Sequence, residues 1–128
     1  MSAPARAGIF IYAKDPEHLA SFYQSVLGMA AAHRTDQMVV LSSPDLQLIV
    51  HAMPPAVASQ IAITIPPQPR DSAAIKFFCT VPSLSGVEES AQALGGHVLP
   101  EQWQGPGFVV RNACDPEGNI FQVRAGAA

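Results

Sequence analysis

The sequence predicts an α+β fold in which two βαβββ modules form a curved mixed sheet around a ligand cup. Two observations predict it. The order of strand, helix cap, helix, glycine and three strands occurs twice along the chain. Equivalent positions also keep a nearly constant interval, since Phe10 and Asp15 match Phe78 and Ser83 at an offset of 68 residues and Gly28 matches Gly95 at an offset of 67. We therefore expect one domain, residues 1–128, whose length is typical of a single domain.

The first module, about residues 7–52, begins with a strand and a helix. Residues 8–13 form a β-branched and aromatic run that predicts the strand. The helix begins at Asp15-Pro16-Glu17, which supplies an N-cap, a first-turn proline and a first-turn acid, and it ends at Gly28. Its apolar face is formed by Leu19, Phe22, Tyr23, Val26 and Leu27. We expect this face to pack against the sheet.

Three further strands complete the first module, at residues 29–34, 38–42 and 46–51. A proline-rich linker follows, at about residues 53–73. Within it, residues 56–65 are compatible with a short helical piece or with an extended piece that adds an edge strand.

The second module, about residues 74–125, repeats the plan. A strand at residues 75–81 precedes a helix whose apolar positions are Leu84, Val87, Ala91 and Leu94. Ser83 and Ser85 are alternative N-caps for this helix, and Gly95-Gly96 ends it. The last three strands are expected at residues 97–100, 108–114 and 119–124.

The composition excludes several kinds of partner. A net charge of −3, with seven Lys and Arg spread singly along the chain, provides no basic stripe for nucleic acid. No apolar run approaches the roughly 18 residues that span a bilayer, and the amino-terminal residues do not resemble a signal peptide. We therefore expect a cytoplasmic protein without nucleic-acid or membrane partners. Cys79 and Cys114 are expected to be buried, reduced packing residues.

Strand alternation divides each strand between a helix-facing and a cup-facing set. In the first strand Ile9, Ile11 and Ala13 should meet the helix, which leaves Gly8, Phe10 and Tyr12 for the cup. The same alternation predicts a cup-facing set in the fifth and last strands, namely Lys76, Phe78, Thr80, Ile120, Gln122 and Arg124.

Two motifs carry a resemblance to a known superfamily. Phe22-Tyr23 precedes Val26-Leu27-Gly28 shortly after Lys14-Asp15, and Asp115-Pro116-Glu117-Gly118-Asn119 precedes the final strand. With the paired modules, these motifs resemble the vicinal oxygen chelate superfamily, which includes glyoxalases, bleomycin-resistance proteins, fosfomycin-resistance enzymes and extradiol dioxygenases. The resemblance covers residues 8–124. The motifs themselves read as structural, because they supply a buried helix face and a turn.

The resemblance implies four metal-ligand positions, and this sequence departs from the pattern at each. Metal-dependent members place a His early in the first strand, a carboxylate or His in the fourth, a His early in the fifth and a Glu in the last. Here these positions hold Gly8, either Gln47 or Ile49, Lys76 and Gln122. His51 shares the parity of the fourth strand, but a single His beside amides and a lysine makes a poor metal site. We expect no metal and no cofactor.

The expected cup has aromatic walls and a few polar anchors, as small-ligand pockets commonly do. Its expected lining residues are Phe10, Tyr12, Gln47, His51, Lys76, Phe78, Trp103, Phe108, Gln122 and Arg124. Lys76 and Arg124, with Arg111 as a further candidate, would make the cup locally positive and favour an anionic or carbonyl-bearing ligand. Trp103 lies in an apparent flexible stretch, residues 101–107, and reads either as a lid or as a packing or dimer contact.

These residues favour a metal-free small-molecule binding protein of the glyoxalase and bleomycin-resistance type that sequesters an antibiotic or a metabolite. One alternative is a lyase, isomerase or dioxygenase-like enzyme of the same superfamily, with Lys76, His51 or Tyr12 doing acid–base work. Another is a structural or regulatory module with a vestigial cup. The resemblance also implies a homodimer in which both subunits complete each cup.

Overall fold

The computed structural model describes residues 5–127. The elements in chain order are β1 (Gly8–Ala13), α1 (Pro16–Leu27), β2 (Ala30–Arg34), β3 (Met38–Ser42), β4 (Gln47–Ala52), α2 (Pro55–Ala58), β5 (Phe78–Thr80), α3 (Leu84–Ala93), β6 (His97–Gly105), β7 (Phe108–Cys114) and β8 (Ile120–Gly126).

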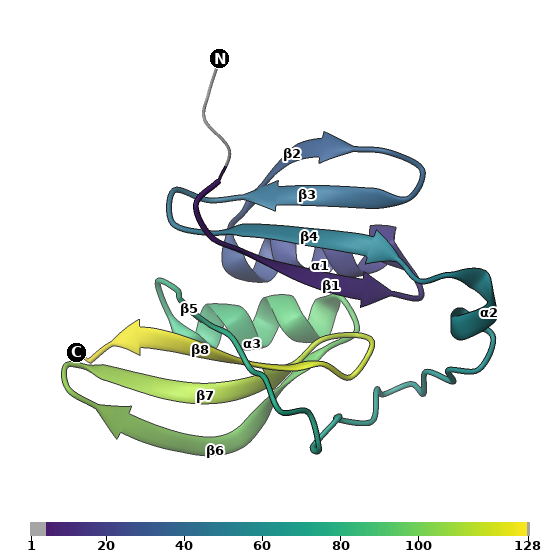
Figure 1. The fold of residues 1–128 in the computed structure, drawn as a ribbon. Helices are drawn as coiled ribbons and strands as arrows, with labels where there is room; N and C mark the ends of the chain where they lie inside the picture. Colours follow the sequence, from purple (N-terminus) through teal and green to yellow (C-terminus); the bar gives the residue numbers. More distant parts are fainter. Residues whose placement is uncertain (1–4, 128) are drawn as a thin grey trace.

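The strands form two four-stranded sheets with the orders β1-β4-β3-β2 and β5-β8-β7-β6. Each sheet is mixed, because the first and last strands of a module pair in parallel and the other pairs are antiparallel. The predicted α+β class with two βαβββ modules is confirmed, although each module has its own sheet. Figure 1 shows the two sheets side by side, with β1 at the edge that faces the second module.

Local signals begin and end the two long helices. The Asp15 side chain accepts a hydrogen bond from the backbone N–H of His18 at 3.1 Å, and Gly28 ends α1 with a φ of 68°. For α3 the structure selects Ser83 as the N-cap, because its hydroxyl accepts from the backbone N–H of Gly86 at 3.0 Å. The alternative start at Ser85 is therefore excluded.

The two modules share one hydrophobic core. The helices α1 and α3 contact each other, and the buried rings of Phe22 and Tyr23 in α1 pack against Phe121 of β8. The ring centroids of Phe22 and Tyr23 lie 6.0 Å and 5.1 Å from that of Phe121. The predicted helix face of module one therefore packs on strands of module two as well as on its own sheet.

The turn before β8 is tied to the start of α1. Asp115 is fully buried and accepts a hydrogen bond from the Tyr23 hydroxyl at 2.7 Å. The Glu117 carboxylate accepts from the backbone N–H groups of Lys14 and Asp15 at 2.7 Å and 2.8 Å. These bonds explain why both motifs occur in one sequence, since each motif satisfies polar groups of the other.

Two strands differ from the prediction by more than two residues at one end. β5 is shorter than residues 75–81, because only Phe78, Cys79 and Thr80 pair with β8. β6 is longer than residues 97–100, because residues 102–105 pair with β7 after a register shift. The expectation of a flexible stretch at residues 101–107 is therefore wrong. Its polar residues suit an exposed edge strand, and β6 is the edge of its sheet.

The linker is mostly irregular and contains the short helix α2. It leaves module one at the end of β4 and reaches module two beside the turn that precedes β8, where the Arg70 N–H donates to the Gly118 carbonyl at 2.9 Å. Among residues 5–127, no helix has the length and apolar composition needed to cross a lipid bilayer.

Candidate functional site

The strands present two sets of side chains, as the alternation predicted. In β1, Ile9 and Ile11 pack against the core, whereas the rings of Phe10 and Tyr12 are exposed. In β8, Phe121 and Val123 are fully buried. The sheet face opposite the helices therefore carries the predicted aromatic and polar residues.

Five of the ten predicted residues line one pocket on module two. This module-two pocket has a volume of about 430 Å³ and is lined by Lys76, Trp103, Gln104, Gly105, Phe108, Val110, Asn112, Gln122 and Arg124. The strand register brings them together, because Val110 pairs with both Trp103 and Arg124, and Asn112 pairs with Gln122. Trp103 is thus held on a strand as a wall of the pocket, and it is not a loop lid.

Arg124 lies between two aromatic rings. Its guanidinium carbon is 3.7 Å from the ring centroid of Phe78 and 4.7 Å from that of Phe108. Such stacking stabilises a cation on the ring face and holds the guanidinium in one orientation. The Nε atom of Arg124 is buried and has no hydrogen-bond partner among residues 5–127.

Lys76 supplies the second cation of the module-two pocket. Its Nζ donates to the Oδ1 atom of Asn112 at 3.2 Å. Within the described part of the chain, the ion pairs are Arg34 with Glu17 and Arg111 with Glu88. Neither Lys76 nor Arg124 has an acidic partner among those residues, so the pocket carries two cations that no carboxylate there neutralises.

Arg111 does not belong to this pocket. It lies on the opposite face of β7, where its guanidinium donates to the carbonyl of Leu99 and pairs with Glu88 of α3. The expectation that Arg111 adds positive charge to the cup is therefore wrong, and strand parity is the reason. The same parity places Asn112 beside Phe108 and Val110, and it would have identified Asn112, which the sequence analysis missed.

The predicted residues of module one form a separate group. Phe10, Tyr12 and His51 make an aromatic cluster with centroid separations of 5.1 Å, 5.5 Å and 5.8 Å. The Nδ1 atom of His51 lies 2.8 Å from the carbonyl oxygen of Ala52, and a hydrogen bond between these atoms fixes the orientation of the ring. Gln47 pairs with Gly8 at the start of β4, away from this cluster. One chain therefore does not bring all ten predicted residues into a single pocket.

The register also bears on the position in β4 where the superfamily resemblance implies a metal ligand and where the sequence left Gln47 and Ile49 as alternatives. Phe10 pairs with Ile49, just as Phe78 pairs with Gln122, so Ile49 is the counterpart of Gln122. The four positions hold a glycine, a hydrocarbon, an ammonium group and an amide, which do not fit a divalent cation. Residues 5–127 also contain no group of three His, Cys, Asp or Glu side chains arranged to hold a metal.

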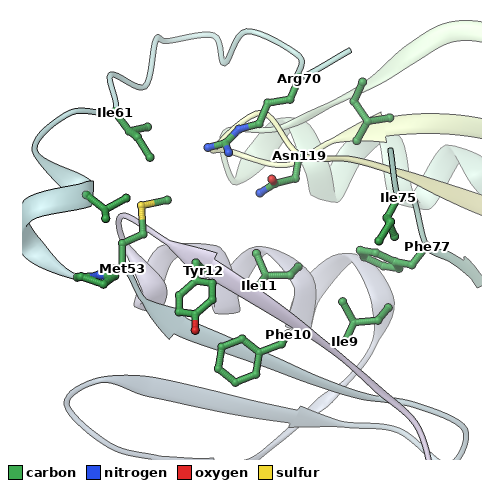
Figure 2. Close-up of a pocket in the computed structure, with 13 residues that line it drawn as sticks. Ile9, Phe10, Ile11, Tyr12, Met53, Ile61, Arg70, Ile75, Phe77 and Asn119 are labelled. Carbon is green, nitrogen blue, oxygen red and sulfur yellow. The ribbon is translucent and has the colours of Figure 1, made fainter. Parts of the chain in front are cut away.

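A second, larger pocket lies in the seam between the modules (Figure 2). This seam pocket has a volume of about 720 Å³ and is lined by Ile9, Phe10, Ile11, Tyr12, Met53, Pro54, Val57, Ile61, Arg70, Ile75, Phe77, Asn119 and Ile120. Only Phe10 and Tyr12 of these were expected near a ligand. The linker residues carry no local signal of this role, because the tertiary fold alone brings them to β1.

Comparisons with known proteins agree with this fold. A family profile described as a glyoxalase-like domain matches residues 8–124. Comparison with curated proteins gives no significant match.

Solved structures also resemble the chain. They include a glyoxalase/bleomycin resistance protein/dioxygenase family enzyme from Burkholderia phytofirmans PsJN, at 17% identity and a TM-score of 0.68 over 97% of this chain and 100% of that chain. The fosfomycin resistance protein FosX from Listeria monocytogenes matches at 15% identity and a TM-score of 0.66, over 99% and 96%. The hypothetical protein SA1046 from S. aureus matches at 19% identity and a TM-score of 0.65, over 97% and 95%.

At these identities the solved structures establish the fold alone, whereas the family profile covers nearly the whole chain. The paired modules, the two buried motifs and the profile match lead to one assignment. The chain belongs to the glyoxalase-like domain family of the vicinal oxygen chelate superfamily.

Proposed function

We propose that this protein binds a small organic anion with an aromatic or conjugated part, using protein groups and no metal. One observation carries the proposal: Lys76 and Arg124 line the module-two pocket without an acidic partner in residues 5–127. The same pocket has Trp103 and Phe108 as aromatic walls. A bound anion would neutralise the two cations, and a planar group would contact the rings.

The proposed biological role is sequestration of an antibiotic or a metabolite. The names of two solved relatives, a glyoxalase/bleomycin resistance protein from Albidiferax ferrireducens T118 and the fosfomycin resistance protein of Listeria monocytogenes, support this role by analogy. The charge of the module-two pocket favours an anionic ligand over a large cationic drug. Cys79 and Cys114 are free thiols, which suits the reducing cytoplasm, where we propose that the protein works.

We further propose that the working form is a homodimer. Phe10, Tyr12, Phe78 and Trp103 are 42–56% exposed, and exposed apolar groups of this size commonly mark a surface that another chain or a ligand covers. The aromatic cluster of module one and the module-two pocket also lie in separate places within one chain. A second copy that sets its module-one cluster over the first copy's module-two pocket would cover these rings and close two equivalent cups.

The test uses fluorescence of Trp103, the single tryptophan of the chain. Salicylate and phenylphosphonate are titrated in buffer with EDTA, with neutral salicylamide and cationic benzamidine as comparison probes. We expect dissociation constants for the two anions that are at least about tenfold lower than those for salicylamide and benzamidine. EDTA should not change the affinity. Arg124→Gln and Lys76→Gln should weaken binding of the anions about tenfold each.

Three outcomes would count against the proposal. The first is an equal change in fluorescence with all four probes, and the second is no change with any of them. The third is a stoichiometric amount of Ni, Zn, Fe or Mn in the purified protein, found by elemental analysis, on which binding depends. Mass spectrometry of the recovered probes separates a binding protein from an enzyme, because turnover would leave a product. Sedimentation analysis reports the oligomeric state independently of ligand binding.

A further inference from the structure

The seam pocket concentrates exposed apolar surface. Of the large apolar side chains that are exposed in residues 5–127, four line it, and two of these, Val57 and Ile75, are not among the rings that the proposed homodimer would cover. Ile75 is 87% exposed, although it lies directly before β5. A contiguous exposed apolar surface around a concavity is typical of a binding site.

The linker wall of the seam pocket is held by hydrogen bonds at three points. The N–H of Met53 donates to the Ala13 carbonyl at 2.9 Å, and the Lys14 side chain contacts the carbonyl of Ile61. Arg70 is fixed at the far end by the bond from its N–H to the Gly118 carbonyl. The wall is therefore built before a ligand arrives, which lowers the entropy lost on binding.

Among residues 5–127, Arg70 is the only charged residue that lines the seam pocket. Its Nε donates to the carbonyl of Glu117 at 3.2 Å, which fixes the plane of the guanidinium. Within residues 5–127 no carboxylate lies within ion-pair distance of it. Figure 2 shows the guanidinium near Asn119, facing the β1 side chains, with Ile61 of the linker on one side of it and Ile75 on the other. The terminal nitrogens remain available for a carboxylate, which they would bind through two parallel hydrogen bonds.

We propose that the seam pocket is a second ligand site, which binds a small amphipathic carboxylate. The carboxylate lies on the guanidinium of Arg70, and the apolar chain or ring lies along Ile9, Ile11 and Ile61. The volume of about 720 Å³ is within the range of small-molecule pockets. This site has its own cation and does not depend on the proposed function of the module-two pocket.

The test is calorimetric titration of the full chain with octanoate and with 1-octanol. We expect octanoate to bind the wild-type protein at least tenfold more tightly than 1-octanol. Arg70→Gln should remove this tenfold preference and leave the affinity for 1-octanol unchanged. Ile61→Asp should abolish binding of both probes. Ile65→Asp is the matched control, because Ile65 is a linker residue that is 98% exposed and does not line the pocket.

The variants also distinguish this site from the module-two pocket. Lys76→Gln should leave octanoate binding unchanged, and Arg70→Gln should leave salicylate binding unchanged. The proposal is wrong if octanoate fails to bind, or if Lys76→Gln weakens its binding as much as Arg70→Gln does. It is also wrong if Ile75→Asp converts a dimer into monomers and octanoate gives no binding heat with the wild-type protein. In that case the apolar surface is a contact between two copies of the chain. Circular dichroism melting confirms that each variant is folded.

Discussion

The Tyr23 hydroxyl donates a hydrogen bond of 2.7 Å to the Asp115 carboxylate, and this bond joins the two modules inside the core. Both residues are fully buried. Asp115 also accepts from the backbone N–H groups of Glu117 and Asn119 and from the Asn119 side chain. The carboxylate thus organises the turn before β8 and attaches it to α1.

Replacement of Tyr23 by phenylalanine should destabilise the fold by about 2 kcal/mol, the usual range for a hydrogen bond to a charged group. The ring would still pack against Phe121, so the decrease in the free energy of unfolding measures the contribution of the hydroxyl group alone. Urea denaturation measures it, with Tyr12→Phe as the control because the Tyr12 ring is half exposed. Equal urea midpoints for the two variants would contradict the structural role of the bond.

Asp115 should make stability depend on pH in a defined direction. Burial raises the pKa of Asp115 above its ordinary value, and the hydrogen bonds from Tyr23 and Asn119 oppose this rise. The folded chain therefore binds a proton at Asp115 more tightly than the unfolded chain does, and this difference in proton binding stabilises the fold. The stabilisation is complete below the ordinary carboxyl pKa of about 4. It is lost as the pH rises through the folded pKa.

The measurement compares the free energies of unfolding of the wild type and of Asp115→Asn between about pH 3.5 and pH 7. This pH range begins just below the ordinary carboxyl pKa of about 4 and extends above it. The wild-type value minus the variant value should decrease as the pH rises. A carbon-13 NMR titration of the Asp115 carboxyl provides an independent reading if the variant folds poorly. A difference that increases with pH would show that the hydrogen bonds outweigh burial.

The two cysteines should react slowly with thiol reagents in the folded protein, and Cys114 should react more slowly than Cys79. Burial, followed by the neighbouring Asp115 charge, raises the pKa of Cys114 to about 12, and burial also raises the pKa of Cys79. Few thiolates therefore exist at neutral pH. A disulfide reagent such as DTNB at pH 8 should label Cys114 only on unfolding and should label the partly exposed Cys79 first. Rapid modification of Cys114 under native conditions would disprove its burial.

Gly105 should be a determinant of the module-two pocket. A Cβ atom at this position would lie 2.2 Å from Cζ of Phe108, so Gly105→Ala must displace that ring. Because Phe108 also packs on Arg124, we expect salicylate affinity to fall about fivefold to tenfold, a typical effect of losing one well-packed aromatic contact.

Gly126→Ala is a close control for this variant. Gly126 pairs with Phe108 on the other side, and a Cβ atom there meets nothing within 4 Å. Fluorescence titration of both variants with salicylate measures the two affinities. Unchanged affinity in Gly105→Ala would show that Phe108 does not contribute to binding.

Local sequence signals were sufficient to predict most of the fold. Asp15 and Ser83 cap their helices through their own side chains, and Gly28 adopts the left-handed conformation that a helix end favours. Strand alternation correctly assigned Ile9 and Phe10 to opposite faces. These features depend on residues within a few positions of one another, which is why the sequence alone determined them.

The arrangement of the candidate sites depended on contacts between distant segments. Trp103 lies on a strand because residues 102–105 pair with β7, and polar edge strands resemble loops in sequence. Arg70 reaches the seam pocket through hydrogen bonds with the turn before β8, 47 residues along the chain. The sequence by itself determined the two modules and three of the four residues at the positions where the resemblance implies metal ligands, whereas the strand register selected Ile49 over Gln47 for the fourth. The tertiary structure alone decided which cations share a pocket, because that depends on register and linker path between residues far apart in the chain.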